Sequence, residues 1–200
     1  MQKKSCLELL RRRKIRNSFL DFVEKFSGFR PAKHQKILIH HLQSMIENNI
    51  QRLMIFMPPG HAKSLYSSVL FPVFYLYKNP IHSIIVASHT SNLAEQFARK
   101  SRNLILSKEF ELICKPMLAK GLKAAAKWRT EAGGEYYALG VGAAVTGKRA
   151  DLAIIDDPIK GIGEADNPEA REKLWQWYLS DLRTRLKPNA KIIIIQTRWH

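Results

Sequence analysis

The chain has 200 residues, 46% of them hydrophobic and 25% charged, which are the proportions of a folded globular protein and exclude global disorder and collagen-like repeats. Its two cysteines, Cys6 and Cys114, exclude a disulfide scaffold and a cysteine-based zinc site and suit the reducing cytosol. The 33 Lys and Arg against 17 Asp and Glu give a formal net charge of +16, which favours polyanionic partners such as nucleic acid, with a solvated Lys-rich surface as the alternative.

The first thirty residues are predicted to form a basic helical segment, distinct from the remainder at 31–200. Residues 1–16 carry seven Lys and Arg and one acid. Residues 6–26 have a helical pattern, because Phe19, Phe22 and Phe26 fall on one face. Pro31 suits the first turn of the next helix.

Four apolar runs predict buried strands at 52–56, 83–87, 152–155 and 191–195. Helical patterns occupy 64–77, 91–107 and the segment from Asn167 to Tyr178, and the Gly-rich residues 127–145 predict a hairpin. Wholly apolar strands alternating with helices predict an α/β fold with a mostly parallel sheet covered on both faces. No apolar stretch reaches the roughly 20 residues of a membrane-spanning helix.

The segment Met57-Pro-Pro-Gly-His-Ala-Lys-Ser64 follows a predicted strand and opens a helix. Backbone N–H groups in that setting bind phosphate, so the loop residues Pro59, Gly60, His61 and Ala62 are candidate phosphate contacts. Lys63 would reach the β- and γ-phosphates, and the Ser64 hydroxyl would bind Mg²⁺. The strict phosphate-loop pattern has glycines where Met57 and Ala62 stand, and an ordinary strand–helix turn is the alternative.

Two further strand ends carry candidate residues. Asp156 and Asp157 end the third strand, so Asp156 is the candidate Mg²⁺ carboxylate and Asp157 the general base. Thr197 ends the last strand and would sense the γ-phosphate, which requires that strand to be internal and next to the strand before Lys63. Arg149, in a Gly-rich loop, would stabilise phosphate charge in cis or from a neighbouring subunit, with a surface hairpin as the alternative.

Taken in order, these motifs resemble the N-terminal ATPase region of the large terminase subunit of tailed bacteriophages. The segments that carry the resemblance are 57–64, 146–160, 177–178, 184–186 and 195–200. The resemblance implies a P-loop NTPase fold of the RecA-like (ASCE) type, with ATP and Mg²⁺ as cofactors. It also implies that Gln35 contacts adenine and that Thr197 couples hydrolysis to movement.

The same resemblance implies a motor that packages double-stranded viral DNA into a capsid in the cytoplasm of a bacterial host. Its partners would be the portal, the small terminase subunit and further copies in a ring. The family continues past the Thr-Arg-Trp-His motif with more of the sheet and a nuclease domain. We therefore expect an ATPase domain that is incomplete at its C-terminus, with an open strand edge; the alternative is an inactive prophage remnant that only binds DNA or partner subunits.

Overall fold

The computed structural model describes residues 2–47, 49–115, 117–119 and 124–198. Within them, six strands form one sheet in the order β1-β6-β5-β2-β4-β3. The strands are β1 (Arg52–Phe56), β2 (Ile84–Ser88), β3 (Lys127–Arg129), β4 (Glu135–Gly140), β5 (Ala150–Asp156) and β6 (Leu186–Gln196). All neighbouring strands run parallel except the antiparallel β3–β4 pair. The predicted α/β class, its parallel strands and its hairpin are thereby confirmed.

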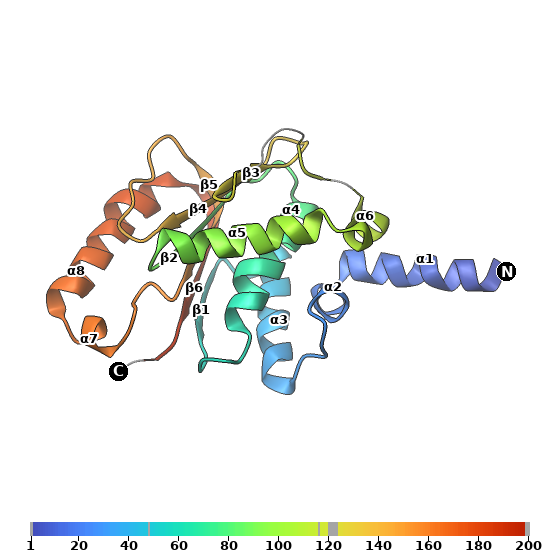
Figure 1. Cartoon of the computed structure of the whole chain (residues 1–200), viewed down its shortest axis with the longest axis horizontal. Coiled ribbons are helices and arrows are strands. Elements are labelled where there is room, and N and C mark those ends of the chain that lie inside the picture. Colours follow the sequence, from blue (N-terminus) through green and yellow to red (C-terminus); the bar gives the residue numbers. More distant parts are fainter. Residues whose placement is uncertain (1, 48, 116, 120–123, 199–200) are drawn as a thin grey trace.

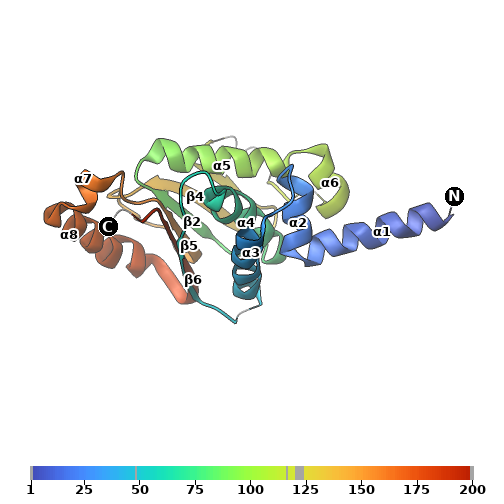
Figure 2. The same ribbon diagram turned by 90° about the horizontal axis from the view of Figure 1, so that it is seen from below.

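Helices lie on both faces of this sheet (Figures 1 and 2). They are α1 (Gln2–Asn17), α2 (Phe19–Phe26), α3 (Lys33–Ile46), α4 (Phe71–Lys78), α5 (Ser91–Ile105), α6 (Lys108–Cys114), α7 (Ile162–Ala165) and α8 (Pro168–Trp177), with π-helical turns η1 (Leu65–Leu70) and η2 (Tyr178–Leu182) and a 3-10 turn η3 (Arg183–Arg185). None of the helices in the described ranges is long and apolar enough to cross a bilayer.

Capping residues decide where several helices begin. The pattern predicted over residues 6–26 is two helices, because the Ser18 hydroxyl accepts the N–H of Asp21 and starts α2 anew. The Asn167 side chain caps α8 by accepting two backbone N–H groups, as the Asn-Pro pair indicates. The Thr90 hydroxyl caps α5 by accepting the N–H of Leu93.

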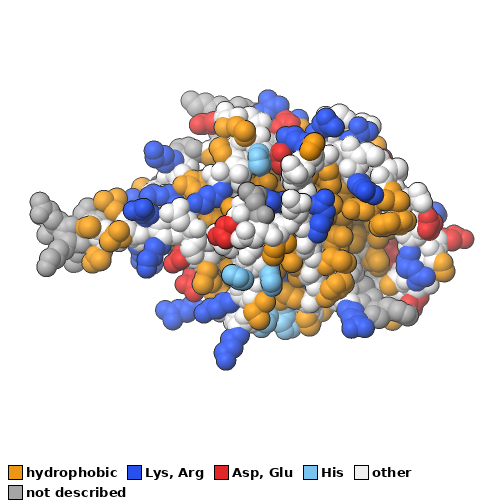
Figure 3. Space-filling model, turned by 180° about the vertical axis from the view of Figure 1, so that it is seen from behind, with side chains coloured by type: hydrophobic (Ala, Val, Ile, Leu, Met, Phe, Trp, Pro, Cys, Tyr) orange, Lys and Arg blue, Asp and Glu red, His pale blue; other side chains and the backbone are white. Residues whose placement is uncertain are grey.

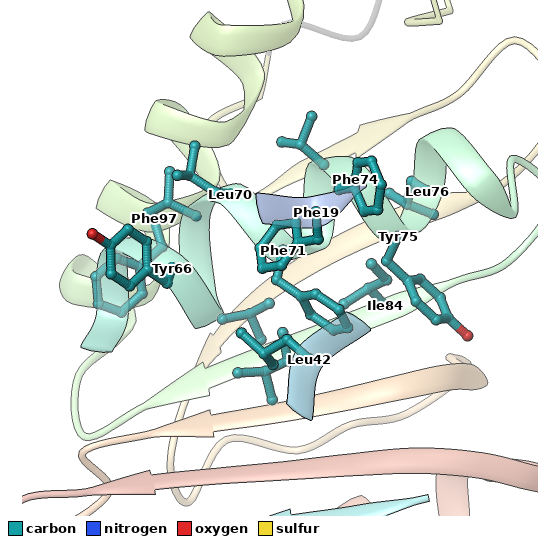
Figure 4. Packing of buried hydrophobic residues seen from close by; sticks show 14 of the residues in the cluster. Phe19, Leu42, Tyr66, Leu70, Phe71, Phe74, Tyr75, Leu76, Ile84 and Phe97 are labelled. Atoms are coloured by element: carbon teal, nitrogen blue, oxygen red, sulfur yellow. The ribbon is translucent and has the colours of Figure 1, made fainter. Parts of the chain in front are cut away.

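Each face of the sheet has its own hydrophobic core, because alternate residues of a strand point to opposite faces. One core packs the sheet against α2, α3, α4 and α5 and is rich in aromatic rings, among them Phe19, Phe71 and Phe74 (Figure 4). The other packs the sheet against α8 and η2 through Trp177 and Leu182. Since α2 shares the first core with α4, the basic N-terminal segment is anchored to the body, and the domain division at residue 30 stays a prediction.

Strand β1 is the edge of the sheet, and β6 is its neighbour in the described structure. The last strand is therefore internal and lies beside the strand that precedes Lys63, as predicted. Ile55 faces the core, but Met54 and Phe56 on the other face are 60% and 57% exposed. An unpaired edge with exposed apolar side chains is a template for association with another chain.

We expect Met54→Lys to reduce self-association, because a charge on an edge strand opposes pairing with a second chain. The expected result is a lower weight-average mass by sedimentation at matched concentration, with an unchanged melting temperature. Leu106→Lys is the matched control, since Leu106 is 65% exposed away from the edge. Equal association of the wild type and both variants would contradict a role for the β1 edge.

Candidate active site

A turn between β1 and a helix that starts at Lys63 forms one side of the site. Gly60 and Ala62 have φ angles of +78° and +60°, a left-handed conformation that glycine adopts freely and alanine does not. The first N–H groups of a helix have no partner within it, and the positive end of the helix dipole adds to their attraction for anions. The turn therefore leads directly into the start of a helix, the setting in which backbone N–H groups bind anions.

Lys63 is buried, with 7% of its surface exposed, and it joins the ends of β5 and β6. Its Nζ donates to Thr197 Oγ1 at 2.9 Å and lies 3.1 Å from Asp157 Oδ2. The other carboxylate oxygen of Asp157 accepts the Thr197 N–H at 2.8 Å. Three predicted site residues thus form a closed triangle of hydrogen bonds.

The backbone of Asp157 also departs from the strand geometry, with φ at +43°. Asp and Asn tolerate this left-handed region better than other residues with a Cβ. Its N–H donates to the Ile195 carbonyl at 2.8 Å, which holds the turn against β6. The conformation turns the carboxylate towards Lys63 instead of continuing the alternation of β5.

Asp156, 1% exposed, is held by three serines. The Ser64 hydroxyl donates to Oδ1 at 3.1 Å, and the Ser68 hydroxyl donates to Oδ2. Ser88, which lies opposite Asp156 on β2, donates to its backbone carbonyl at 2.8 Å. Burial raises the pKa of Asp156 to about 6, although the two hydroxyls and Lys63 favour the charged form.

Ser68 and Ser88 were not among the predicted site residues. The signal for Ser68 is its spacing, because residues four apart share one face of a helix. The π-helical turn η1 contains Ser68, and such turns recur at functional sites. The signal for Ser88 is its place at the end of a strand that neighbours β5.

The donors around Asp156 fit Mg²⁺, the metal that the predicted chemistry requires. A carboxylate and a hydroxyl oxygen from Ser64 are hard ligands, and Mg²⁺ in nucleotide sites takes one or two such protein ligands, with water and phosphate oxygens completing the octahedron. Ser64 and Asp156 are in direct contact in this structure. They would hold the ion together.

Arg149 lies away from this group. It precedes Ala150, the first residue of β5, whereas Asp156 is the last. At about 3.3 Å per residue, the two ends of this strand are about 20 Å apart. The predicted cis contact of Arg149 with the phosphates is therefore wrong, because the loop after β4 runs from the carboxyl ends of the strands back to their amino ends before it reaches Arg149.

Gln35 lies on α3, behind the turn, and contacts the carbonyl of His61. His61 points its ring nitrogen Nδ1 back to the carbonyl of Pro59 at 2.9 Å. The loop residues Pro59 to Ala62 lie in the turn between β1 and Lys63, with Pro59 and Gly60 exposed, and their contact with phosphate stays a prediction. Trp199 and His200, part of the terminase-like motif, lie outside the described residues.

No family model and no curated protein matches the sequence. Among solved structures, the fold is similar to the crystal structure of the HK97 bacteriophage large terminase, with a TM-score of 0.55, 13% identity, and coverage of 92% of this chain and 38% of that one. It is also similar to a mutant ATPase domain of the Thermus phage P74-26 large terminase, with a TM-score of 0.51, 17% identity, and coverage of 84% of this chain and 70% of that one.

These similarities confirm the predicted fold: the chain has the P-loop NTPase fold of terminase ATPase domains. The resemblance drawn from the motifs is confirmed at the level of structure. At these low identities the likeness shows the fold alone. The chain spans 38% of the length of the HK97 protein.

Proposed function

We propose that this chain is an ATPase of the large-terminase type, which hydrolyses ATP to drive double-stranded viral DNA into a capsid. The observation that supports it most is the contact of Lys63 with both Asp157 and Thr197. These residues come from three distant parts of the sequence, and they meet at the carboxyl edge of the sheet, where ligands bind in α/β folds. The terminase-like fold supports the same assignment.

In the proposed reaction, water attacks the γ-phosphorus of ATP. The bond between that phosphorus and the β–γ bridging oxygen breaks, which yields ADP and phosphate. The loop N–H groups and Lys63 bind the phosphates, where negative charge is spread in the transition state. Mg²⁺, when bound, neutralises further phosphate charge. Asp157 orients the water and accepts its proton.

Asp157 is paired with Lys63 in this structure. A γ-phosphate that binds the Lys63 amine would break this ion pair and leave the Asp157 carboxylate to bind water. The same exchange of partners would change the contacts of Thr197, because its hydroxyl contacts Lys63 and its N–H contacts Asp157. This gives a physical route from phosphate binding to β6. The coupling role of Thr197 rests on it.

The direct test is ATP turnover by the purified chain, measured with and without double-stranded DNA, with Asp157→Asn as the inactive control. Turnover that DNA stimulates is the expected result. Nucleotide binding without turnover in either condition would instead favour a protein that only binds DNA or partner subunits. In the proposal, those partners are the portal, the small terminase subunit and further copies in a ring, where Arg149 would serve a neighbouring copy.

DNA binding is expected to be electrostatic and independent of sequence. Lys and Arg gather along the projecting helix α1 and the adjoining face (Figure 3). Arg12 and Arg16 donate to the carbonyls that end α6 and fix α1 in place, whereas Arg11, Arg13 and Lys14 are exposed. These three cations are free to meet phosphates.

Changing Arg11, Arg13 and Lys14 together to Gln should weaken DNA binding and flatten its salt dependence. Each lost phosphate contact removes about 0.9 from the slope of log affinity against log salt concentration. Titrations by fluorescence anisotropy at several salt concentrations measure this. The control changes three exposed cations around α8, at the far end of the molecule from α1 (Figure 1): Lys160, Lys173 and Arg183. An identical slope for the α1 variant and the wild type would contradict the assignment.

A further inference from the structure

The side-chain amide of Gln35 is almost wholly used inside the protein. Its Oε1 accepts the N–H of Ala32 at 2.9 Å and the hydroxyl of Tyr66 at 3.2 Å. Its Nε2 donates to the carbonyl of His61 at 3.2 Å. An amide oxygen has two acceptor positions, so Oε1 is saturated and one N–H of Nε2 is left.

Those contacts hold two adjacent carbonyls at the C-terminal side of the phosphate loop. Gln35 holds the His61 carbonyl, immediately before the left-handed Ala62. The N–H of Tyr66 donates to the carbonyl of Ala62 at 3.1 Å, and its hydroxyl returns to Gln35. An unfavourable backbone conformation persists only where its surroundings hold it, and this ring of hydrogen bonds supplies the hold.

Burial protects this ring of hydrogen bonds from solvent. Tyr66 is fully buried and Gln35 is 9% exposed. Burial raises the pKa of the Tyr66 hydroxyl, which keeps it a donor to Gln35. The loop is thus tied to α3 on one side and to η1 on the other.

The same contacts conflict with a role for Gln35 in reading adenine. A glutamine amide reads adenine best through two bonds, in which its oxygen accepts from the exocyclic amine and its nitrogen donates to N7. The oxygen of Gln35 has no free acceptor position. The paired contact would require the bonds to Ala32 or Tyr66 to break.

We propose that Gln35 is a positioning residue that holds the phosphate loop in its binding conformation and does not read the adenine base. This inference rests on the proposed function, since it requires the loop to bind a nucleotide. Tyr66 shares the role, because it completes the ring of hydrogen bonds.

The test is the affinity of the full chain for ATP, GTP and inorganic triphosphate, each with Mg²⁺, by calorimetry. Gln35→Ala should weaken all three ligands by the same factor, about fivefold for the loss of a net hydrogen bond. Tyr66→Phe should weaken all three by a smaller common factor. Gln96→Ala, an exposed glutamine on α5, is the control and should change none of them.

Gln35→Glu keeps the acceptor for Ala32 and Tyr66 but sets a carboxylate oxygen against the His61 carbonyl. It should also weaken all three ligands, and because a buried charge destabilises the fold, its melting temperature is measured to choose a titration temperature at which the variant is folded. A loss confined to ATP in the Gln35 variants would identify an adenine contact and overturn the proposal, as would unchanged affinity for every ligand. A wild type that binds none of the three would overturn the proposed function together with this inference.

Discussion

Replacement of Lys63 by alanine is expected to weaken Mg-ATP binding by at least tenfold. The side chain is buried and its Nζ lies at the meeting point of Thr197 and Asp157. A hydrogen bond to a charged group contributes about 1.5–3 kcal/mol, and 1.4 kcal/mol is a factor of ten in affinity. Titration with a fluorescent ATP analogue measures the change, and circular dichroism confirms that the variant is folded.

Lys36→Ala is the matched control, because Lys36 is exposed on α3. It should bind the analogue as the wild type does. The loss in Lys63→Ala should be larger for ATP than for AMP, since the amine is expected to contact the β- and γ-phosphates. Equal ATP affinity in the wild type and a folded Lys63→Ala variant would exclude a phosphate-binding role for the loop.

The residues at strand ends could be predicted from sequence because a parallel sheet brings its carboxyl ends to one edge. Lys63, Asp156, Asp157 and Thr197 each follow an apolar run in the sequence. Once those runs are recognised as neighbouring strands, their ends must converge. The observed contacts among Lys63, Asp157 and Thr197 follow from that rule.

The path of loops could not be predicted in the same way. Arg149 stands near Gly147 in the sequence, and the Gly-rich pattern is that of a flexible loop. Nothing local shows that this loop returns to the amino ends of the strands before it enters β5. Connections between parallel strands must cross in this way. The direction of β5 is therefore the information that corrects the predicted position of Arg149.

Side chains that support the site from behind were also beyond the sequence patterns. Ser88 contacts the backbone of Asp156 because β2 and β5 are paired in register, and register depends on the whole sheet. Tyr66 reaches Gln35 across 31 positions of the chain. An apolar helical pattern predicts burial for Tyr66 but does not identify the partner of its hydroxyl.

The burial of Asp156 leads to a second large effect, on stability. Its pKa is about 6 in the folded protein, against an ordinary value of 3.8, because burial disfavours the charged carboxylate. A group with a raised pKa in the folded state contributes stability below its ordinary pKa and loses that contribution as pH rises through the folded value. For Asp156 the window runs from about pH 4 to about pH 6.

Asp156→Asn should therefore stabilise the nucleotide-free protein at pH 8. A difference of about 2 between the folded and ordinary pKa values corresponds to about 3 kcal/mol, which the variant no longer loses above pH 6. The oxygen of the asparagine amide can still accept from the Ser64 hydroxyl, and its NH₂ group can donate to the Ser68 oxygen. Near pH 4 the free energies of unfolding of the two proteins should be similar.

Urea unfolding of both proteins between pH 4 and pH 8 measures this difference directly, because effects common to both cancel in the comparison. Addition of Mg-ADP at pH 8 should reverse the order, because ligand binding stabilises the folded state by an amount that grows with the logarithm of ligand concentration over Kd, and the wild type keeps the carboxylate that Mg²⁺ requires. The variant should gain much less from Mg-ADP than the wild type. Parallel pH curves would show that Asp156 is ionised at no cost to folding, and equal stabilisation by Mg-ADP would remove it from the metal site.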